Sequence, residues 1–383
     1  MELLPKPYFL SCYYKWRRID QRFSKLNMSG SFSRRFGRPL LLLLLLFRWA
    51  IPLNATPFPE RKCRSPIVRK EWRTLTRGEQ TEYLTAVKCF MSKPGITPRA
   101  DAPGAVSRYD DLIVTHIHQT FDIHYVGHFL PWHRWFTALY EKSLRDECGY
   151  RGAQPYWDWT LDVTTLCKFT KSPVFDPVFG FGGNGPYVPS NNTDGIDVPG
   201  RRGGGCVKDG PFKDMVVNLG PLSDLSGNPR CLKPDFSPYF AGRYLGMNQT
   251  KLTLDQPDFG SFSRVVEGGP SFDTSGVHGG GHYGVGGTYG QMGDLYTSPA
   301  DPIFFLHHAN LDRIWWSWQT QDLSRRLKDI SGPIYLMDYT NSQGGNVTLD
   351  FEITMGLNAK NITIRDTMDI RGNAFCFTYD KLY

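Results

Sequence analysis

Apolar residues recur three and four positions apart in four stretches of the chain, which is the spacing of one face of a helix. In the first stretch these positions include Trp72 and Leu84, set among charged residues. Pro131 opens the third stretch, and proline is favoured at the first position of a helix. Ser298 or Asp301 is expected to cap the fourth stretch. The pattern predicts helices over residues 69–92, 110–126, 131–147 and 302–327.

Other parts of the chain lack this helical pattern. Residues 160–265 are rich in Gly, Pro and Asn, which predicts long ordered loops and small strands. Residues 268–293 contain eleven Gly, a poor composition for a helix. Residues 347–353 and 374–379 are strand-like. We therefore expect a mainly α fold, in which a four-helix-bundle core carries long loops and a few short strands.

The positive charge of the chain is concentrated at its start. The 383 residues carry a net charge of +7, but residues 1–54 hold ten Lys and Arg against two acids, so the remainder carries −1. This distribution argues against nucleic acid as a partner. The apolar run 40–47 follows the basic segment in the order of a signal peptide and is too short to span a membrane. We expect residues 1–55 to be a secretory leader, with a start at Met28 or an uncleaved anchor as alternatives.

Cysteines and glycosylation sequons also favour export. Seven of the eight Cys follow the leader, scattered and without a Cys-x-x-Cys pair, as expected for isolated disulfides in an oxidising compartment. Cys63 with Cys89 and Cys206 with Cys231 are the predicted pairs, and an odd number leaves one Cys free. Acceptor triplets for N-glycosylation begin at Asn54, Asn191, Asn248, Asn346 and Asn361.

All nine histidines fall within residues 116–133 and 278–308, which makes scattered structural roles improbable and predicts a metal site. His278 and His282 would share a face if that segment were helical. His116 and His124 can also share a face, and Pro131 would start a second helix that returns His133 toward them. The spacing predicts two groups of three imidazoles on facing helices.

The residues around the histidines narrow the choice of metal. They include no Cys and no Glu-x-x-His pattern, which argues against structural zinc and di-iron sites. Imidazole ligation alone suits copper, zinc, iron or nickel. Asp312 lies one turn after His308 and could be a carboxylate behind that ligand or a salt-bridge partner.

Residues 116–159 and DPIFFLHHANLDRIWWSW (301–318) resemble the two copper-binding signatures of the type 3 copper proteins. That family comprises tyrosinases, catechol oxidases and haemocyanins, and the short fungal tyrosinase-like oxidases are the most similar. The resemblance implies a dicopper catalytic domain over residues 56–383. It also implies two ligand sets, one for each copper ion: His116, His124 and His133 for the first, and His278, His282 and His308 for the second.

The remaining histidines are left without a ligand role by the same resemblance. His307 would be a neighbour of the ligand His308, and His118 would be extra. His128 lies four residues after His124 and is a rival ligand.

Two positions bear on the reaction. Family members that hydroxylate monophenols often have Asn directly after the first ligand of the second copper, helped by a Glu that holds a water. Gly279 stands at the Asn position, which removes a side-chain acceptor, and Glu267 is the candidate Glu. Asp122 stands where some members have a Cys that forms a thioether.

The end of the chain also resembles the family pattern. Phe377-Thr378-Tyr379 is similar to the Tyr-x-Tyr motif that closes the catalytic domain, and Arg69 to the Arg that pairs with it. Many relatives continue into a domain that plugs the site. The resemblance leads us to expect no such plug and an open site.

The expected reaction is oxidation of an ortho-diphenol to an ortho-quinone, with O2 reduced to water and the ring accommodated by Gly279–Gly281. The expected partners are O2 and a small phenol. One alternative is hydroxylation of monophenols or o-aminophenols, with the tailoring of a secondary metabolite as its role. Two other classes stay open: an O2 carrier of the haemocyanin kind, and a hydrolytic or binding site without copper.

Overall fold

A computed structural model describes residues 63–191, 197–372 and 374–383. The expected leader, its apolar run and the sequon at Asn54 lie outside these ranges. None of the helices within them combines the length and the apolar character that crossing a bilayer requires.

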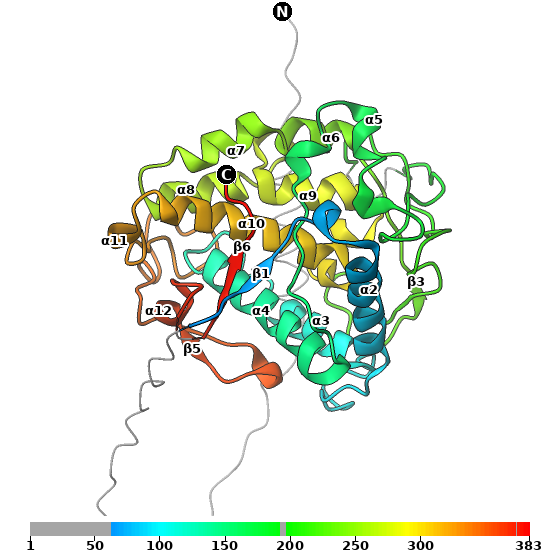
Figure 1. Ribbon diagram of the computed structural model, residues 1–383, viewed down its shortest axis with the longest axis horizontal. Coiled ribbons are helices and arrows are strands. Elements are labelled where there is room, and N and C mark those ends of the chain that lie inside the picture. Colours follow the sequence, from blue (N-terminus) through cyan, green and yellow to red (C-terminus); the bar gives the residue numbers. More distant parts are fainter. Residues whose placement is uncertain (1–62, 192–196, 373) are drawn as a thin grey trace, which may run out of the picture. The chain divides into compact units, whose positions relative to one another are not determined.

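The described chain is mainly helical, as expected (Figure 1). The helices are α2 (Arg77–Ser92), α3 (Arg108–Gln119), α4 (Phe129–Cys148), α5 (Leu166–Phe169), α6 (Pro238–Tyr244), α7 (Met247–Leu254), α8 (Phe259–Glu267), α9 (Val277–Gly286), α10 (Ile303–Thr320), α11 (Leu323–Arg326) and α12 (Ile364–Thr367). The strands are β1 (Ile67–Arg69), β2 (Val216–Val217), β3 (Arg230–Cys231), β4 (Glu352–Ile353), β5 (Ile362–Thr363) and β6 (Phe377–Tyr379). Short 3₁₀ turns connect several of these elements.

Helix α10 lies at the centre of the core. Every residue from Ile303 to Gln319 is buried, so the helix has no solvent-facing stripe. It packs against α4 and α9, while α2 packs against α3 and α4. The N-cap position of this helix is Pro302, one residue after the predicted Asp301, whose side chain accepts a hydrogen bond from the backbone N–H of Ile303 at 3.0 Å.

Helix α2 begins later than the apolar pattern predicts. The predicted helix 69–92 is interrupted by strand β1 and a 3₁₀ turn over Trp72–Thr74, and α2 starts at Arg77. The reason is local: Thr76 and Glu79 form a reciprocal capping box, in which each side chain accepts from the other residue's backbone N–H. The residues before Thr76 that were expected in this helix belong to β1, the 3₁₀ turn and the segments that connect them.

Helices α6, α7, α8 and α9 lie in regions that the sequence does not predict to be helical. Ser237 and Asp258 cap α6 and α8 by accepting backbone N–H groups. Helix α9 forms despite its glycines because it packs against α6, α8 and α10. Tertiary packing therefore overrides an unfavourable helix propensity here.

The two ends of the described chain lie side by side. Strand β1, blue in Figure 1, pairs in parallel with β6, red, in the register Ile67 to Phe377. The disulfide Cys63–Cys376 adds a covalent link next to this pair. The predicted pair Cys63–Cys89 is therefore wrong, because Cys89 bonds to Cys148 and so joins α2 to the end of α4. The predicted pair Cys206–Cys231 is confirmed, and Cys167 is free and exposed.

Candidate metal centre

Three buried histidines meet between α3 and α4. His116 comes from α3, His133 from α4, and His124 from the loop that joins them. The Nδ1 atoms of these residues lie 2.7–2.8 Å from backbone carbonyl oxygens, of Tyr296 for His116, Thr120 for His124 and Phe129 for His133. A carbonyl can only accept, so each Nδ1 carries the proton and each Nε2 keeps a free lone pair. This is the tautomer that a metal site requires.

A second buried group forms between α9 and α10. His278 and His282 lie one turn apart on α9, and His308 comes from α10. The Nδ1 of His282 donates to the carbonyl of Met292 at 2.9 Å. The Nε2 atoms of His282 and His308 lie 3.2 Å apart. Two imidazole lone pairs at that distance repel each other unless a proton or a metal ion lies between them.

The two groups fit metal ions. In each group, one ring nitrogen from every histidine lies within 4.8 Å of the others. Among the described residues, the Nε2 atoms of His116, His133 and His278 are buried without a hydrogen-bond partner, a costly arrangement that a bound cation would relieve. The rings of His133 and His308 stack with centroids 4.5 Å apart, so the groups adjoin. Six imidazoles and no thiolate form a donor set that suits copper.

Burial keeps all six imidazoles neutral. It lowers the pKa of His124 to about 4 and that of His282 to about 3, because the charged form loses its hydration. It also lowers the pKa of the other four, assisted by neighbouring histidines. A metal competes with the proton for the imidazole lone pair, so a lowered pKa favours metal binding at neutral pH.

The other histidines lie outside both groups. His118 is exposed. The ring of His128 packs on Phe351, with centroids 4.7 Å apart. The Nε2 of His307 lies 3.0 Å from the carbonyl oxygen of His278, so this side chain hydrogen-bonds to the backbone of α9.

Asp312 is a salt-bridge partner, and its carboxylate makes no hydrogen bond to the ring of His308, whose Nδ1 has no partner among the described residues. It accepts from Arg134, from Arg69 at 3.4 Å and from the hydroxyl of Tyr379. Arg69 also pairs with Glu141 at 2.6 Å, and its guanidinium lies 3.5 Å from the ring centre of Phe377. The pairing of Arg69 with the 377–379 segment agrees with the expectation from the sequence.

This buried cluster joins four elements that surround the site. Arg69 and Tyr379 lie on β1 and β6, whereas Arg134 and Asp312 lie on α4 and α10, next to the ligand-bearing turns. Sequence reasoning missed the parts played by Arg134 and Glu141. The signal in the sequence was that Arg134 and Glu141 are charged residues on the apolar side of the predicted helix 131–147.

Glu267 lies at the end of α8 and points toward the loop of the first group. Its carboxylate accepts from the backbone N–H of Tyr125, the residue after His124, at 2.5 Å. Burial raises the pKa of Glu267 well above its ordinary value, and the Tyr125 N–H offsets this only in part. The carboxyl borders a cavity of about 10 Å³ that Ser263 and Tyr339 also line. That volume is about enough for one water molecule.

The three glycines after His278 serve different purposes. A Cβ atom added to Gly280 would lie 2.8 Å from Cβ of Tyr244, and one on Gly281 would lie 2.1 Å from the ring of His307. These two glycines allow close packing against α6 and α10, so the expectation that all three make room for a substrate is wrong. Only Gly279 is partly exposed, and a Cβ there would meet Ser275 and Tyr283.

Comparisons with known proteins support the same chemistry. A family model described as the common central domain of tyrosinase matches residues 106–321. The N-acetyl-6-hydroxytryptophan oxidase of Emericella nidulans is 36% identical over 370 residues, covering 89% of this chain and 100% of that protein. A tyrosinase-like protein of Diaporthe leptostromiformis is 33% identical over 399 residues, covering 94% and 95%.

A similar fold is found in a solved structure. A glycine-to-asparagine variant of a polyphenol oxidase from Thermothelomyces thermophila matches with a TM-score of 0.76 and 40% identity. The match covers 82% of this chain and 89% of that one.

Proposed function

The chain belongs to the tyrosinase family, and from that premise we propose that it oxidises an ortho-diphenol to an ortho-quinone with O2 as the electron acceptor. The observation that carries the proposal is the pair of adjoining histidine groups, His116, His124 and His133 with His278, His282 and His308. Their geometry is consistent with a binuclear type 3 copper centre. Bound copper would supply the redox chemistry, passing electrons from the phenol to O2.

The residues of the chain would hold and shield this centre. Carbonyl groups fix the tautomers of His116, His124, His133 and His282, so the ligand nitrogens need no rearrangement on binding. Burial of all six rings keeps bulk water away from the ligand atoms.

Glu267 is the proposed proton acceptor for the phenolic hydroxyl, acting through a water molecule. Three observations support this role: the carboxylate is buried, it contacts the residue after His124, and it borders a cavity about the size of one water. Burial raises the pKa of Glu267, so the ionised form of this carboxyl binds a proton more strongly than that of an exposed Glu.

A second candidate is the oxidation of a monophenol or an o-aminophenol within a larger metabolite. The name of the E. nidulans relative gives a hydroxytryptophan as the substrate of that protein. This observation favours a substrate with a substituent larger than that of simple catechol.

Oxygen uptake by the copper-loaded protein tests these proposals. Catechol, its matching phenol and o-aminophenol are compared at equal concentration, with copper content measured on the same sample. Catechol consumption without phenol consumption supports the diphenol reaction. Rapid oxygen uptake with phenol, without a lag, favours the second candidate. Two bound coppers with reversible O2 binding and no turnover indicate an O2 carrier, and fewer than two coppers contradict the dicopper site.

The three disulfides fit an oxidising compartment. We further propose that residues 1–55 direct the protein to the secretory pathway and that residues 56–383 form the catalytic domain. N-terminal sequencing of the mature protein tests the position of cleavage.

A further inference from the structure

The hydroxyl of Ser275 occupies the space of a side chain that the helix lacks. A Cβ atom built on Gly279 would lie only 2.2 Å from Oγ of Ser275, far inside contact distance. Gly279 directly follows His278 and is only partly buried. The place beside the second histidine group that a residue 279 side chain would fill is therefore taken by a hydroxyl from the preceding loop.

This hydroxyl has free lone pairs. In the part of the chain that the structure describes, its one hydrogen bond is a long donation to the carbonyl of Gly276, at 3.4 Å. A hydroxyl that donates its proton in this way still has two acceptor positions. The nearest side chain beyond it is the ring of Tyr283, whose edge lies 3.7 Å from the same Cβ position. Ser275 thus offers a polar acceptor next to an aromatic surface.

The loop that carries Ser275 is held in place at both ends. Gly268 and Ser275 form an antiparallel bridge, and the N–H of Gly276 donates to the carbonyl of Glu267 at 3.2 Å. At the tip, the N–H of Gly269 donates to the carbonyl of Thr274 at 2.6 Å. The loop therefore connects Glu267 directly to the start of α9.

Aromatic packing fixes the same loop from the side. The ring centre of Phe272 lies 5.7 Å from that of Phe240 and 5.1 Å from that of Tyr283. The hydroxyl of Tyr244 donates to the carbonyl of Phe272. These contacts position Ser275 before any ligand arrives, which lowers the entropy that a hydrogen bond to it would cost.

We propose that the Ser275 hydroxyl replaces the side chain missing at Gly279 and accepts a hydrogen bond from the phenolic hydroxyl of a substrate bound at the second histidine group. The inference rests on the proposed function, since it concerns the same site. Gly279 has no side chain that could accept a hydrogen bond, and in this proposal Ser275, in the loop before α9, supplies the acceptor.

Equilibrium binding without turnover tests the contact. Resorcinol can donate hydrogen bonds but cannot form an ortho-quinone, whereas its dimethyl ether cannot donate. Binding of both to the copper-loaded protein is measured under nitrogen for the wild type, Ser275→Ala and the control Ser271→Ala. We expect Ser275→Ala to weaken resorcinol binding about five- to tenfold and to leave the ether unchanged, as for one lost hydrogen bond. Ser271→Ala, in the same loop, should change neither.

A double-mutant cycle supplies the second test. Gly279→Asn alone should displace the Ser275 hydroxyl, because its Cβ would lie 2.2 Å from Oγ, and place an amide oxygen there instead. Ser275→Ala should then cost little resorcinol affinity in the Gly279→Asn background, because the hydroxyl no longer makes the contact there. Additive effects, or an unchanged Kd for resorcinol in Ser275→Ala, would overturn the inference.

Two further measurements keep the outcomes distinct. If Ser275→Ala does not fold, Ser275→Cys keeps the volume with a weaker acceptor and should show the same selective loss. Wild-type turnover of catechol is measured in parallel. A protein that oxidises catechol but shows no effect of Ser275 contradicts this inference alone, and one that oxidises no phenol contradicts the proposed function.

Discussion

The adjacent side chains of His307 and His308 illustrate how hydrogen bonding separates a member of the second histidine group from its neighbour. The Nε2 of His307 is committed to the carbonyl of His278, and its ring lies 5.0 Å from that of Trp159. His308 instead directs its Nε2 to the second histidine group. His128 is also buried, but it belongs to neither group.

We predict that His308→Ala binds about one copper per chain, because the second group would keep only two imidazoles. His307→Gln and His128→Asn should keep both coppers, the former with lower thermal stability because the support of α9 is weakened. Metal analysis after gel filtration measures the stoichiometry.

His128→Asn serves as the control for loss of a buried histidine. Loss of copper in His128→Asn with retention in His308→Ala would contradict the assignment and favour the rival ligand.

At the scale of elements, glycine-rich α9 depends on close approach to α10. A Cβ on Gly281 would lie 2.1 Å from the His307 ring. Gly242 on α6 provides a contrast, because a Cβ there would meet no atom within 4 Å.

We predict that Gly281→Ala lowers the free energy of unfolding by about 1–3 kcal/mol, as expected for overpacking, and reduces copper binding. Gly242→Ala should raise the free energy of unfolding by up to about 1 kcal/mol, since alanine favours the helix. Denaturant titration of both copper-free proteins measures the difference. Equal effects of the two substitutions would show that packing against His307 does not constrain α9.

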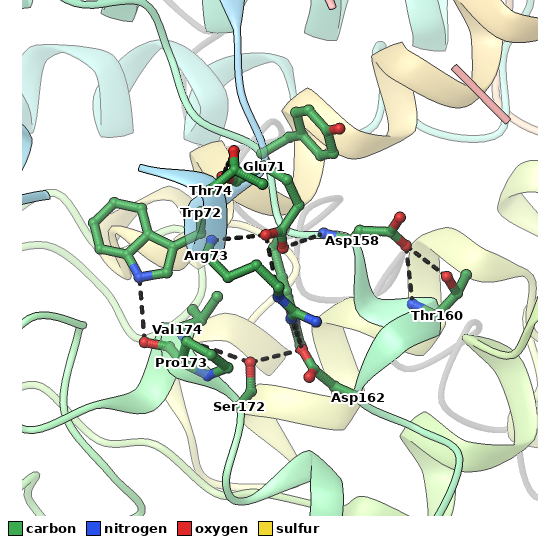
Figure 2. A network of polar contacts seen from close by, with 12 residues as sticks. Glu71, Trp72, Arg73, Thr74, Asp158, Thr160, Asp162, Ser172, Pro173 and Val174 are labelled. Atoms are coloured by element: carbon green, nitrogen blue, oxygen red, sulfur yellow. Dashed lines mark hydrogen bonds and ion pairs between the residues drawn. The ribbon is translucent and has the colours of Figure 1, made fainter. Parts of the chain in front are cut away.

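A second element-scale feature is the polar network that connects the 3₁₀ turn Trp72–Thr74 to the loop over Asp158–Asp162 (Figure 2). Glu71 accepts from the backbone N–H of Arg73 at 2.7 Å, and Arg73 pairs with Asp162 at 2.8 Å. Asp158 continues the network to Arg313 of α10 at 3.1 Å. The network therefore ties the surface turn to the helix that carries His308.

The pH dependence of stability tests this network. Burial raises the pKa of Glu71 from 4.5 to about 7, although Arg73 partly opposes the shift. The folded protein then holds this proton more tightly than the unfolded chain, so the free energy of unfolding falls as pH rises from about 4.5 to 7. Glu71→Gln removes the titrating group, so the Tm should depend less steeply on pH between about 4.5 and 7.

Glu82→Gln is the matched control, because Glu82 is partly exposed and pairs with the exposed Arg151. The control should keep the wild-type slope. A slope in Glu71→Gln equal to that of the wild type would show that Glu71 titrates normally.

The sequence predicts those elements whose apolar pattern is continuous. The pattern predicts helices α2, α3, α4 and α10 because apolar residues recur three and four positions apart along each of them. The confinement of the histidines to two segments, together with the resemblance to the copper-binding signatures, predicts the six that form the two groups. Helices α6–α9 were missed because they are stabilised by contacts distant in the chain, such as Gly284 of α9 against Ala241 of α6.

Contacts between residues distant in the chain also determine parts of the site, and the sequence does not predict these. The carbonyl groups that fix the histidine tautomers and the hydroxyl of Ser275 come into place only through the fold. The partner of Cys63 lies 313 residues away, and spacing alone does not identify it.

At the scale of the whole molecule, the Cys63–Cys376 disulfide closes nearly the entire described chain. Crosslinks that close long loops restrict the unfolded chain most. We predict that Cys376→Ser lowers the free energy of unfolding by about 2–5 kcal/mol. Cys206→Ser should cost less, because the disulfide Cys206–Cys231 closes only a 25-residue separation.

Cys167→Ser is the control, since this thiol is free. Chemical denaturation without reductant measures the free energy of unfolding of the three variants and so ranks their effects. A smaller effect for Cys376→Ser than for Cys206→Ser would contradict the loop-length argument.

The pairing of β1 with β6 also sets an order for biosynthesis. Glu141 of α4, which pairs with Arg69, emerges from the ribosome well before Asp312 and Tyr379, the other partners of Arg69 in the cluster. Until then Arg134 lacks the Asp312 carboxylate that neutralises it in the core, and Arg69 has Glu141 as its ionic partner but not Asp312. The first histidine group is thus synthesised long before the cluster behind it can close. The cluster that joins β1, α4, α10 and β6 therefore cannot close until residue 379 has been synthesised, so the packing beside the first histidine group forms late in biosynthesis.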